Sequence, residues 1–381
     1  MKKMITVVGA RPQIIKASAV SRAIDNTFSN EIQQLVVHTG QHYDHNMSEV
    51  FFDELNIPAP SYNLQVGSGS HAMQTATIIE QLENIFEKEQ PDGVLVYGDT
   101  NSTVAAAITA SKMQIPLIHI EAGLRSYNKI MPEEINRVLT DHVSTLLFCP
   151  TETAVRNLIR EGIQGDHDEQ ATIDNPLYFL CGDIMFDNSL YFSGLSAVNS
   201  SILNDLGLAD KEYILATIHR NATTDSVANL NSVFRAILKV QQETGLKMVL
   251  PLHPRTRKMM DTYLSEPLRR ELEDNRSIIN IPPAGFLDII ALEKGAILIM
   301  TDSGGLQKEA FFFQKPCVIL RTTTEWIEIV ENGNAILAGI TEEEVVSATK
   351  LLLAKSDYTY PTIFGDGKAA EFIVKTIIQN I

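Results

Sequence analysis

The chain has 381 residues, of which 44% are hydrophobic and 20% charged, and its formal net charge is −16. This length suits two domains of about 150–200 residues, while the acidic charge argues against a nucleic acid or an anionic membrane as a partner. The longest apolar runs fall short of the ~18 residues that a membrane span needs. Three cysteines without metal-ligand spacing indicate a reducing, cytoplasmic setting with neither a disulfide nor a bound metal.

Short β-branched runs alternate with longer amphipathic segments along almost the whole chain. The predicted strands are 4–8, 34–38, 93–97, 117–120, 146–149, 214–218, 247–251, 278–281, 297–301 and 317–320. The helices predicted between them include 71–89, 102–113, 132–144, 225–244 and 305–314. This alternation predicts an α/β protein with parallel sheets covered on both faces.

A polar, loop-like stretch at 165–171 interrupts the alternation, which restarts beyond it. We therefore predict a Rossmann-like domain over 1–175 and a second one over 176–365. We expect the last segment, 366–381, to return as a helix to the first domain. Two doubly wound domains with a ligand cleft between them follow, and ligands of such folds bind at the carboxyl ends of the strands.

The first strand runs into Gly9-Ala-Arg-Pro and then Lys16. Pro12 suits a first helical turn, and Arg11 and Lys16 would bring positive charge to the strand end. The motif is neither a dinucleotide fingerprint nor a P-loop. Two solvated basic side chains explain it equally well when it is taken alone.

Acidic residues follow the next strands of the first domain. Asp99 and Glu121 each come directly after a predicted strand, and Glu133 and Glu134 follow Pro132 at a helix start. Helix capping accounts for Asp99, and the helix dipole accounts for Glu133 and Glu134. It does not account for Glu121. Parallel strands can bring these acids to one sheet edge, where crowding would separate their pKa values and provide an acid and a base.

The second domain has a glycine-rich junction at Ser303-Gly304-Gly305, where a buried strand meets a helix. Free N–H groups and the helix dipole make such a junction an anion site, and Glu309 lies one to two turns further on, where it could accept ribose hydroxyls. A serine N-cap followed by glycines is an equally good explanation of the junction by itself. His219-Arg220 and His253-Pro-Arg255 also follow predicted strands.

Together these motifs resemble the non-hydrolysing UDP-N-acetylglucosamine 2-epimerases, which share the GT-B fold of many glycosyltransferases. The likeness covers nearly the whole chain, in order. It rests on Gly9-Ala-Arg-Pro, Thr39-Gly-Gln-His42, Gly98-Asp-Thr100, Glu121-Ala-Gly-Leu-Arg125, Pro132-Glu-Glu-Ile-Asn-Arg137, His219-Arg220, Thr301-Asp-Ser-Gly-Gly305, Gln307, Glu309 and Thr324-Glu325.

The resemblance implies inversion at C2 of a UDP-N-acetylated sugar, UDP-GlcNAc to UDP-ManNAc, as a supply of surface polysaccharide precursor. UDP is eliminated and added back, without an external cofactor, and the family likeness implies a homodimer. By motif position, the implied catalytic residues are Asp99, Glu121, Glu133 and His219, with the acid and the base left unassigned. The implied UDP contacts are Arg11, Lys16, His219, Ser303, Gly304, Gly305, Glu309 and, beside uracil, Ile289 in place of the usual Phe.

Several positions depart from the family pattern. Asn221-Ala222 follows His219-Arg220 where a basic residue and Glu are usual, and Trp326 replaces an Arg that faces the ligand. Asp44 stands where some members have a Gln that helps bind an allosteric UDP-N-acetylglucosamine. The Glu325-Trp326 form resembles a subgroup that epimerises UDP-2,3-diacetamido-2,3-dideoxyglucuronate, which is therefore an alternative substrate.

Three other functions share the predicted nucleotide site. A GT-B glycosyltransferase would need an acceptor cleft, and a non-catalytic sensor would bind a UDP-sugar and signal by domain closure. A hydrolysing relative would release free N-acetylmannosamine and UDP.

Overall fold

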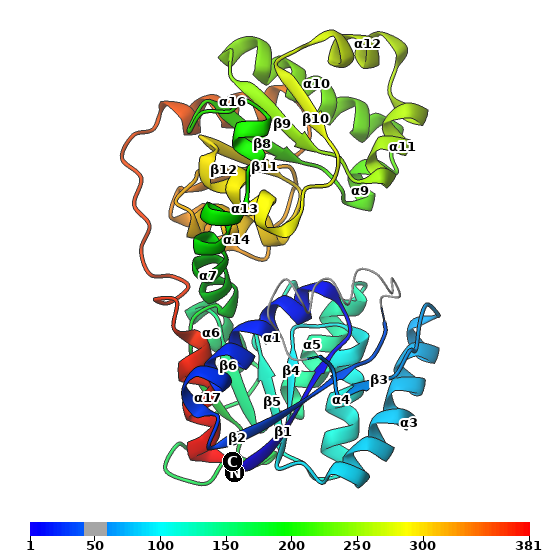
Figure 1. Ribbon diagram of the computed structural model, residues 1–381, viewed down its shortest axis with the longest axis vertical. Coiled ribbons are helices and arrows are strands. Elements are labelled where there is room, and N and C mark those ends of the chain that lie inside the picture. Colours follow the sequence, from blue (N-terminus) through cyan, green and yellow to red (C-terminus); the bar gives the residue numbers. More distant parts are fainter. Residues whose placement is uncertain (42–58) are drawn as a thin grey trace. The chain divides into compact units, whose positions relative to one another are not determined.

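The computed structural model describes residues 1–41 and 59–381, and its contacts divide the chain into two units. Unit 1 contains residues 1–188 and 362–381, and unit 2 contains residues 189–361. Helix α7 (Ile184–Asn199) begins in unit 1 and ends in unit 2. Each unit is a parallel sheet with helices on its faces (Figure 1), which confirms the predicted α/β class and its two Rossmann-like halves.

The sheet of unit 1 has the strand order β3-β2-β1-β4-β5-β6-β7, and every neighbouring pair is parallel. Its strands are β1 (Lys2–Val8), β2 (Ile32–His38), β3 (Tyr62–Asn63), β4 (Gly93–Tyr97), β5 (Leu117–Ile120), β6 (Leu146–Cys149) and β7 (Leu177–Leu180). Its helices are α1 (Arg11–Ala23), the π-helix η1 (Ile24–Phe28), α3 (His71–Glu89), α4 (Asn101–Lys112), α5 (Pro132–His142), α6 (Glu152–Arg160) and α17 (Ala369–Asn380).

The sheet of unit 2 has the order β10-β9-β8-β11-β12-β13 and is also parallel throughout. Its strands are β8 (Tyr213–Thr217), β9 (Lys247–Pro251), β10 (Ile278–Ile281), β11 (Leu298–Thr301), β12 (Cys317–Ile319) and β13 (Ala335–Leu337). Its helices are α8 (Ile202–Asp205), α9 (Asn221–Thr224), α10 (Val227–Thr244), α11 (Pro254–Tyr263), α12 (Glu266–Asp274), α13 (Phe286–Gly295), α14 (Gly304–Phe312), α15 (Ile327–Glu331) and α16 (Glu342–Ala354).

The central strands explain why the sequence folds this way. All five residues of β4 are buried, as are all four residues of β5 and of β6. A strand covered by helices on both faces has apolar residues at successive positions, which is typical of a parallel sheet in an α/β protein. Because all neighbouring strands are parallel, the polar residues that follow the strands lie at one edge of each sheet.

Helix α17 follows the turn-rich segment after Pro361 and belongs to unit 1. It packs beside α1, as the red and blue helices of Figure 1 show. Asp187 accepts hydrogen bonds from the N–H groups of Ala369 (3.2 Å) and Ala370 (2.7 Å). The first turn of α17 is thereby fixed to the start of α7 through a charge-assisted helix cap.

Candidate functional site

The turn between β1 and α1 holds the first predicted motif. Gln13 accepts hydrogen bonds from the N–H groups of Gly9 (2.9 Å) and Ala10 (3.2 Å), and it donates to the carbonyl of Tyr97 (2.8 Å) at the end of β4. A side chain at Gly9 would collide with the hydroxyls of Ser102 and Thr39. The glycine therefore lets three strand ends approach closely, and Pro12 lies in the first turn of α1 as predicted.

Acidic and basic side chains from four of these elements meet at the strand ends of unit 1. Arg137 of α5 forms an ion pair with Asp99, which follows β4, and Lys16 of α1 forms one with Glu121, which follows β5. A Cβ added to Gly98 would lie 3.2 Å from the Glu121 carboxylate and 3.4 Å from the Lys16 ammonium. The structure thus brings Asp99, Glu121 and Lys16 together, as parallel topology predicts.

Arg137 is the functional candidate that the sequence did not single out. Burial alone would lower the pKa of its guanidinium, but the negative charges of Asp99, Glu134 and Glu121 raise it. Its side chain is 9% exposed and bonds Glu134 at 3.1 Å as well as Asp99. The i, i+3 spacing of Glu134 and Arg137 on one helix face is the sequence signal for this pair.

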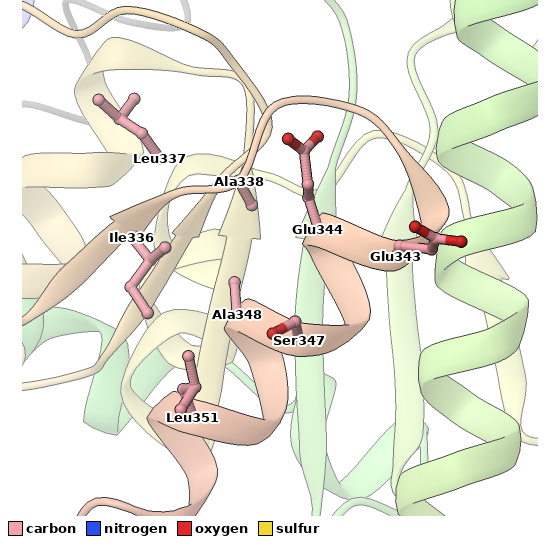
Figure 2. Close-up of a pocket in the computed structure, with 8 residues that line it drawn as sticks. All are labelled: Ile336, Leu337, Ala338, Glu343, Glu344, Ser347, Ala348 and Leu351. Atoms are coloured by element: carbon pink, nitrogen blue, oxygen red, sulfur yellow. The ribbon is translucent and has the colours of Figure 1, made fainter.

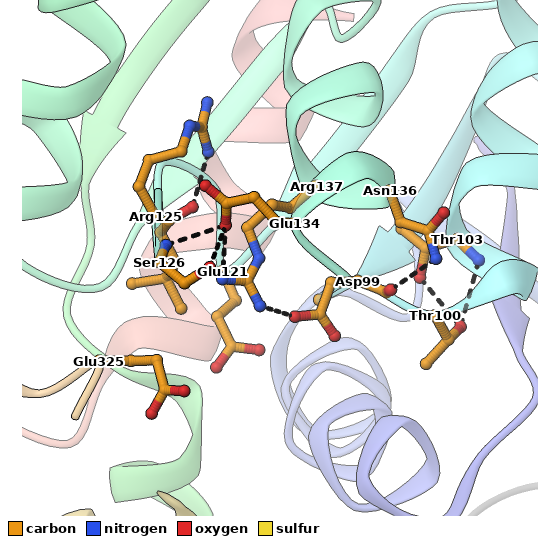
Figure 3. Close-up of polar contacts among 12 residues, drawn as sticks. Asp99, Thr100, Thr103, Glu121, Arg125, Ser126, Glu134, Asn136, Arg137 and Glu325 are labelled. Atoms are coloured by element: carbon orange, nitrogen blue, oxygen red, sulfur yellow. Dashed lines mark hydrogen bonds and ion pairs between the residues drawn. The ribbon is translucent and has the colours of Figure 1, made fainter. Parts of the chain in front are cut away.

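The two glutamates at the start of α5 differ in their surroundings. Glu134 is buried and accepts hydrogen bonds from Ser126 N–H (2.9 Å), Ser126 Oγ (3.0 Å) and Tyr127 N–H (2.9 Å). Figure 3 shows the bonds between Ser126 and Glu134 beside the Arg137–Asp99 pair. Glu133, the implied catalytic residue, is exposed in the first turn of the helix. Glu134 therefore organises the loop before α5, and Glu133 has a side chain open to solvent.

Glu121 has an unusual backbone. Its φ is +72°, in the left-handed region that a non-glycine residue rarely adopts. The N–H groups of Glu121 (3.1 Å) and Ala122 (3.0 Å) both donate to the carbonyl of Phe148. Such a conformation costs about 1–3 kcal/mol and persists where the surroundings fix it. The fold therefore imposes a strained turn in order to present this carboxylate.

Unit 2 supplies the predicted helix start. Ser303 is the N-cap residue of α14, but its side chain makes no capping hydrogen bond to the helix. The alternative of a serine whose hydroxyl caps the helix therefore does not describe this junction. Asp302, which is fully buried, accepts hydrogen bonds from the N–H groups of His219 (3.1 Å) and Arg220 (3.0 Å). This carboxylate joins the end of β8 to the end of β11, so His219 lies beside the α14 N-terminus.

Gly304 is surrounded by polar groups of the same unit. A Cβ added there would lie 3.8 Å from Arg220 Nη2, from Glu325 Oε2 and from Trp326 Nε1. The Trp326 ring lies 4.1 Å from the Lys308 ammonium, a cation–π contact. Trp326, the departure from the family pattern, therefore lies next to the helix start.

Glu309 and Ile289, the implied ribose and uracil contacts, lie on α14 and α13. Both are half-buried. The Ile289 N–H already donates to the carbonyl of Gly285 (2.9 Å), which leaves no free N–H for a ligand. Glu293 of α13 is fully buried, and neither of its carboxylate oxygens has a hydrogen-bond partner among the described residues. Burial, together with the charge of Glu309, raises the pKa of Glu293 well above its usual range.

Other sequence signals have structural roles or fall elsewhere. His253 caps α11 by accepting from the Arg255 N–H (3.2 Å), and Arg255 pairs with Asp225 at 2.6 Å. Arg11 is exposed in the first turn of α1. His42 and Asp44 lie outside the described residues.

The described residues hold no group of three or more His, Cys, Asp or Glu side chains arranged to bind a metal ion. Within the same residues, no helix is long and apolar enough to cross a membrane. A shallow hollow of about 340 Å³ lies between β13 and α16 (Figure 2) and includes none of the predicted site residues.

Comparisons with known proteins show which family the chain resembles. The family model described as UDP-N-acetylglucosamine 2-epimerase matches residues 25–378. A Methanococcus maripaludis protein named UDP-N-acetylglucosamine 2-epimerase homolog is 46% identical, with 100% of both chains covered. The Pseudomonas aeruginosa UDP-2,3-diacetamido-2,3-dideoxy-D-glucuronate 2-epimerase is 44% identical, with 99% of each covered.

A solved structure gives the same result. The Methanocaldococcus jannaschii UDP-GlcNAc 2-epimerase, crystallised with UDP-GlcNAc and UDP, has a TM-score of 0.84 to this chain at 39% identity, with 99% of each chain covered. The family model, the related sequences and the solved structure each match nearly the whole chain. The chain belongs to the UDP-N-acetylglucosamine 2-epimerase family.

Proposed function

We propose that this enzyme reversibly inverts C2 of a UDP-linked 2-acetamido sugar. A carboxylate takes the C2 proton while the C1–O bond to the diphosphate breaks, and UDP leaves with the bonding electrons. A second acid then protonates C2 of the resulting glycal from the opposite face, and the UDP oxygen adds back to C1. Atoms and charges balance, so the cycle uses no oxidant, reductant or external cofactor.

The observation that carries the proposal is the carboxylate cluster at the strand ends of unit 1. Asp99 and Glu121 lie on adjacent strand ends, each paired with a cation, Arg137 or Lys16. Removal of a weakly acidic C–H proton needs a positioned base, and delivery to the other face needs a separate acid. We assign these tasks to Asp99, Glu121 and Glu133, and leave open which of them is the base.

We further propose that unit 2 holds UDP and unit 1 carries out the proton transfers. The N-terminus of α14 at Ser303–Gly305 would bind the diphosphate with its N–H groups and its dipole. His219, fixed beside it through Asp302, would donate to the departing oxygen, and Glu309 would bind the ribose. Arg11 and Lys16 would add charge from unit 1. Lys16 pairs with Glu121 in this structure, and its ammonium has further donors with which it could contact a diphosphate.

Two substrates fit this chemistry. UDP-GlcNAc is the substrate that the family description indicates, and UDP-2,3-diacetamido-2,3-dideoxyglucuronate is supported by the 44% identical P. aeruginosa relative and by the Glu325-Trp326 form. Incubating the purified protein with each compound in D₂O, with ¹H NMR detection, tests the proposal. We expect the C2 epimer to form with deuterium at C2. If both compounds give no C2 epimer and no exchange of the C2 proton, the proposed function is refuted.

We also propose a homodimer that works in the cytoplasm. The basis is the family likeness together with three cysteines, Cys149, Cys181 and Cys317, that form no disulfide. Light scattering coupled to gel filtration tests the dimer: a mass near 84 kDa, about twice the 42.2 kDa chain, supports it and a mass of one chain refutes it.

A further inference from the structure

A fully buried histidine lies beneath the carboxylate cluster. His119 is the third residue of β5, the interior strand that leads to Glu121, and none of its surface is exposed. Its Nδ1 lies 2.6 Å from Asp141 Oδ1, and its Nε2 lies 2.8 Å from the carbonyl oxygen of Gly98. The residue after Gly98 is Asp99, so the ring joins α5 to the turn that carries a proposed catalytic acid.

The two contacts define how many protons the ring carries. A backbone carbonyl only accepts hydrogen bonds, so Nε2 must donate to Gly98. An ionised carboxylate also only accepts, so Nδ1 must donate to Asp141. A neutral imidazole has one N–H and would leave a buried contact between two acceptors. Both ring nitrogens of His119 are therefore donors, which is the imidazolium form.

Asp141 is ionised because it is surrounded by donors. Its Oδ2 accepts from Arg125 Nη1 (2.7 Å) and from the N–H of Gly123 (3.1 Å). Complete burial by itself raises the pKa of this carboxyl, but the charges and hydrogen bonds of His119 and Arg125 lower it overall. The carboxylate thus binds two cations and one backbone N–H group at once.

The surrounding charges balance. Arg125 forms a two-pronged pair with Glu161 at 2.6 and 2.7 Å in addition to its bond with Asp141. Two cations, His119 and Arg125, then face two anions, Asp141 and Glu161, and His142 Nε2 lies 3.5 Å from Glu161 Oε2. Cys149 also lies near Asp141 among the described residues. Burial and the negative charge of Asp141 raise the pKa of the Cys149 thiol, which stays neutral. Buried charges are tolerated when they are paired in this way.

We propose that His119 is a positioning residue that donates from both ring nitrogens and, through Asp141, locks the two turns carrying Asp99 and Glu121 into one geometry. Its ring holds the Gly98 carbonyl, and Asp141 holds the Gly123 N–H, two residues after Glu121. Its effect on rate rests on the proposed catalytic roles of Asp99 and Glu121, whereas its charge state does not.

The two donor contacts are tested by ¹⁵N NMR of wild-type protein labelled at histidine, at neutral pH. We expect one histidine with protons on both ring nitrogens, and expect Asp141→Asn to remove the second proton and thereby assign the signal. A His119 ring with one proton overturns the inference, as does a doubly protonated ring that is unaffected by Asp141→Asn.

The positioning role is tested by His119→Gln, with His167→Gln as a matched control on an exposed loop residue. We expect kcat for C2 deuterium exchange to fall about 10–100-fold, as for residues that orient a reacting group, with KM within about threefold of wild type. The control should retain wild-type rates. A folded His119→Gln enzyme with wild-type kcat refutes the positioning role.

The two ideas fail separately. A doubly protonated His119 in a protein without epimerase activity would support the charge assignment and refute the proposed function. If His119→Gln does not fold, the NMR measurement on the wild-type protein still decides the charge state, and kcat of Asp141→Asn decides the positioning role, because Asp141 is the link between the two turns. A wild-type kcat in that variant refutes it.

Discussion

Substituting Gly123 with Ala probes the turn that presents Glu121. Gly123 has φ +78°, and an added Cβ would lie 2.8 Å from the Ala154 carbonyl carbon and 3.1 Å from the Ala154 Cα, both of them backbone atoms of α6. Gly162 offers a matched control in the same unit, since its φ is +89° and an added Cβ would meet no atom within 4 Å. Both variants place an alanine in a left-handed backbone conformation, but only Gly123→Ala also brings the new Cβ against Ala154.

The expected cost follows from these two terms. At either position alanine costs about 1–2 kcal/mol for the left-handed backbone. At Gly123 the overlap with Ala154 adds about 1–3 kcal/mol, because backbone cannot move aside as a side-chain tip can. For a unit of this size, 1 kcal/mol lowers the melting temperature by about 2–4 °C. Gly123→Ala should therefore melt about 2–12 °C below Gly162→Ala.

Differential scanning calorimetry of the unit 1 transition measures the difference. C2 deuterium exchange on the same samples should fall further in Gly123→Ala than in Gly162→Ala, because the Asp141–Gly123 bond holds the Glu121 turn. Equal melting temperatures for the two variants would refute the packing argument. Equal exchange rates would show that the turn tolerates displacement without loss of chemistry.

Three further predictions concern single side chains. Glu133→Gln should lower C2 exchange about 10²–10⁴-fold without lowering the melting temperature. Glu134→Gln should lower the melting temperature, because it removes the charge of a buried partner of Arg137. The reverse pattern would exchange the roles of the two glutamates. Gly304→Ala should leave stability intact, since its Cβ contacts at 3.8 Å are ordinary, yet weaken UDP binding at least about tenfold by calorimetry; unchanged affinity would place the diphosphate elsewhere. Desolvation raises the pKa of Asp187 from 3.8 to about 6, so the folded state binds this proton more tightly than the unfolded state. The free energy of unfolding should therefore fall as pH rises from about 4 to 6. Chemical denaturation should show no such fall in Asp187→Asn, and an identical fall in the variant would contradict the prediction.

Much of the fold was predictable because the signals are local. The strands at 93–97, 117–120, 146–149, 247–251 and 278–281 have the predicted bounds. Most of their residues are apolar, which is the pattern of a strand covered on both faces, and only Lys247, His119 and Asn280 within them are polar. Three strands were missed: β3 at Tyr62–Asn63, β7 at Leu177–Leu180 and β13 at Ala335–Leu337. All three are short strands at a sheet edge, where the local sequence signal is weakest.

The candidate site was predictable in position and less so in detail. Strand ends place Asp99 and Glu121 together because parallel topology requires it. Sequence does not show which of two adjacent glutamates, Glu133 or Glu134, turns inward, since both suit a first helical turn equally. Arg137 was missed as a site residue because its role depends on which face of α5 turns toward Asp99 at the end of β4.

His119 is the clearest limit of the sequence. A histidine within an apolar strand reads as an ordinary core residue, and its partner Asp141 lies 22 positions away on another element. Only the three-dimensional arrangement shows that both ring nitrogens face acceptors.

We propose that strand-end carboxylates of unit 1 exchange the C2 proton of a UDP-linked sugar. The ¹H NMR rate of deuterium incorporation at C2 in D₂O, for wild type and for Glu121→Gln, measures this exchange. We expect exchange and epimer in wild type, and a loss of about 10²–10⁴-fold in the variant with UDP affinity retained. Undiminished exchange in Glu121→Gln would contradict it.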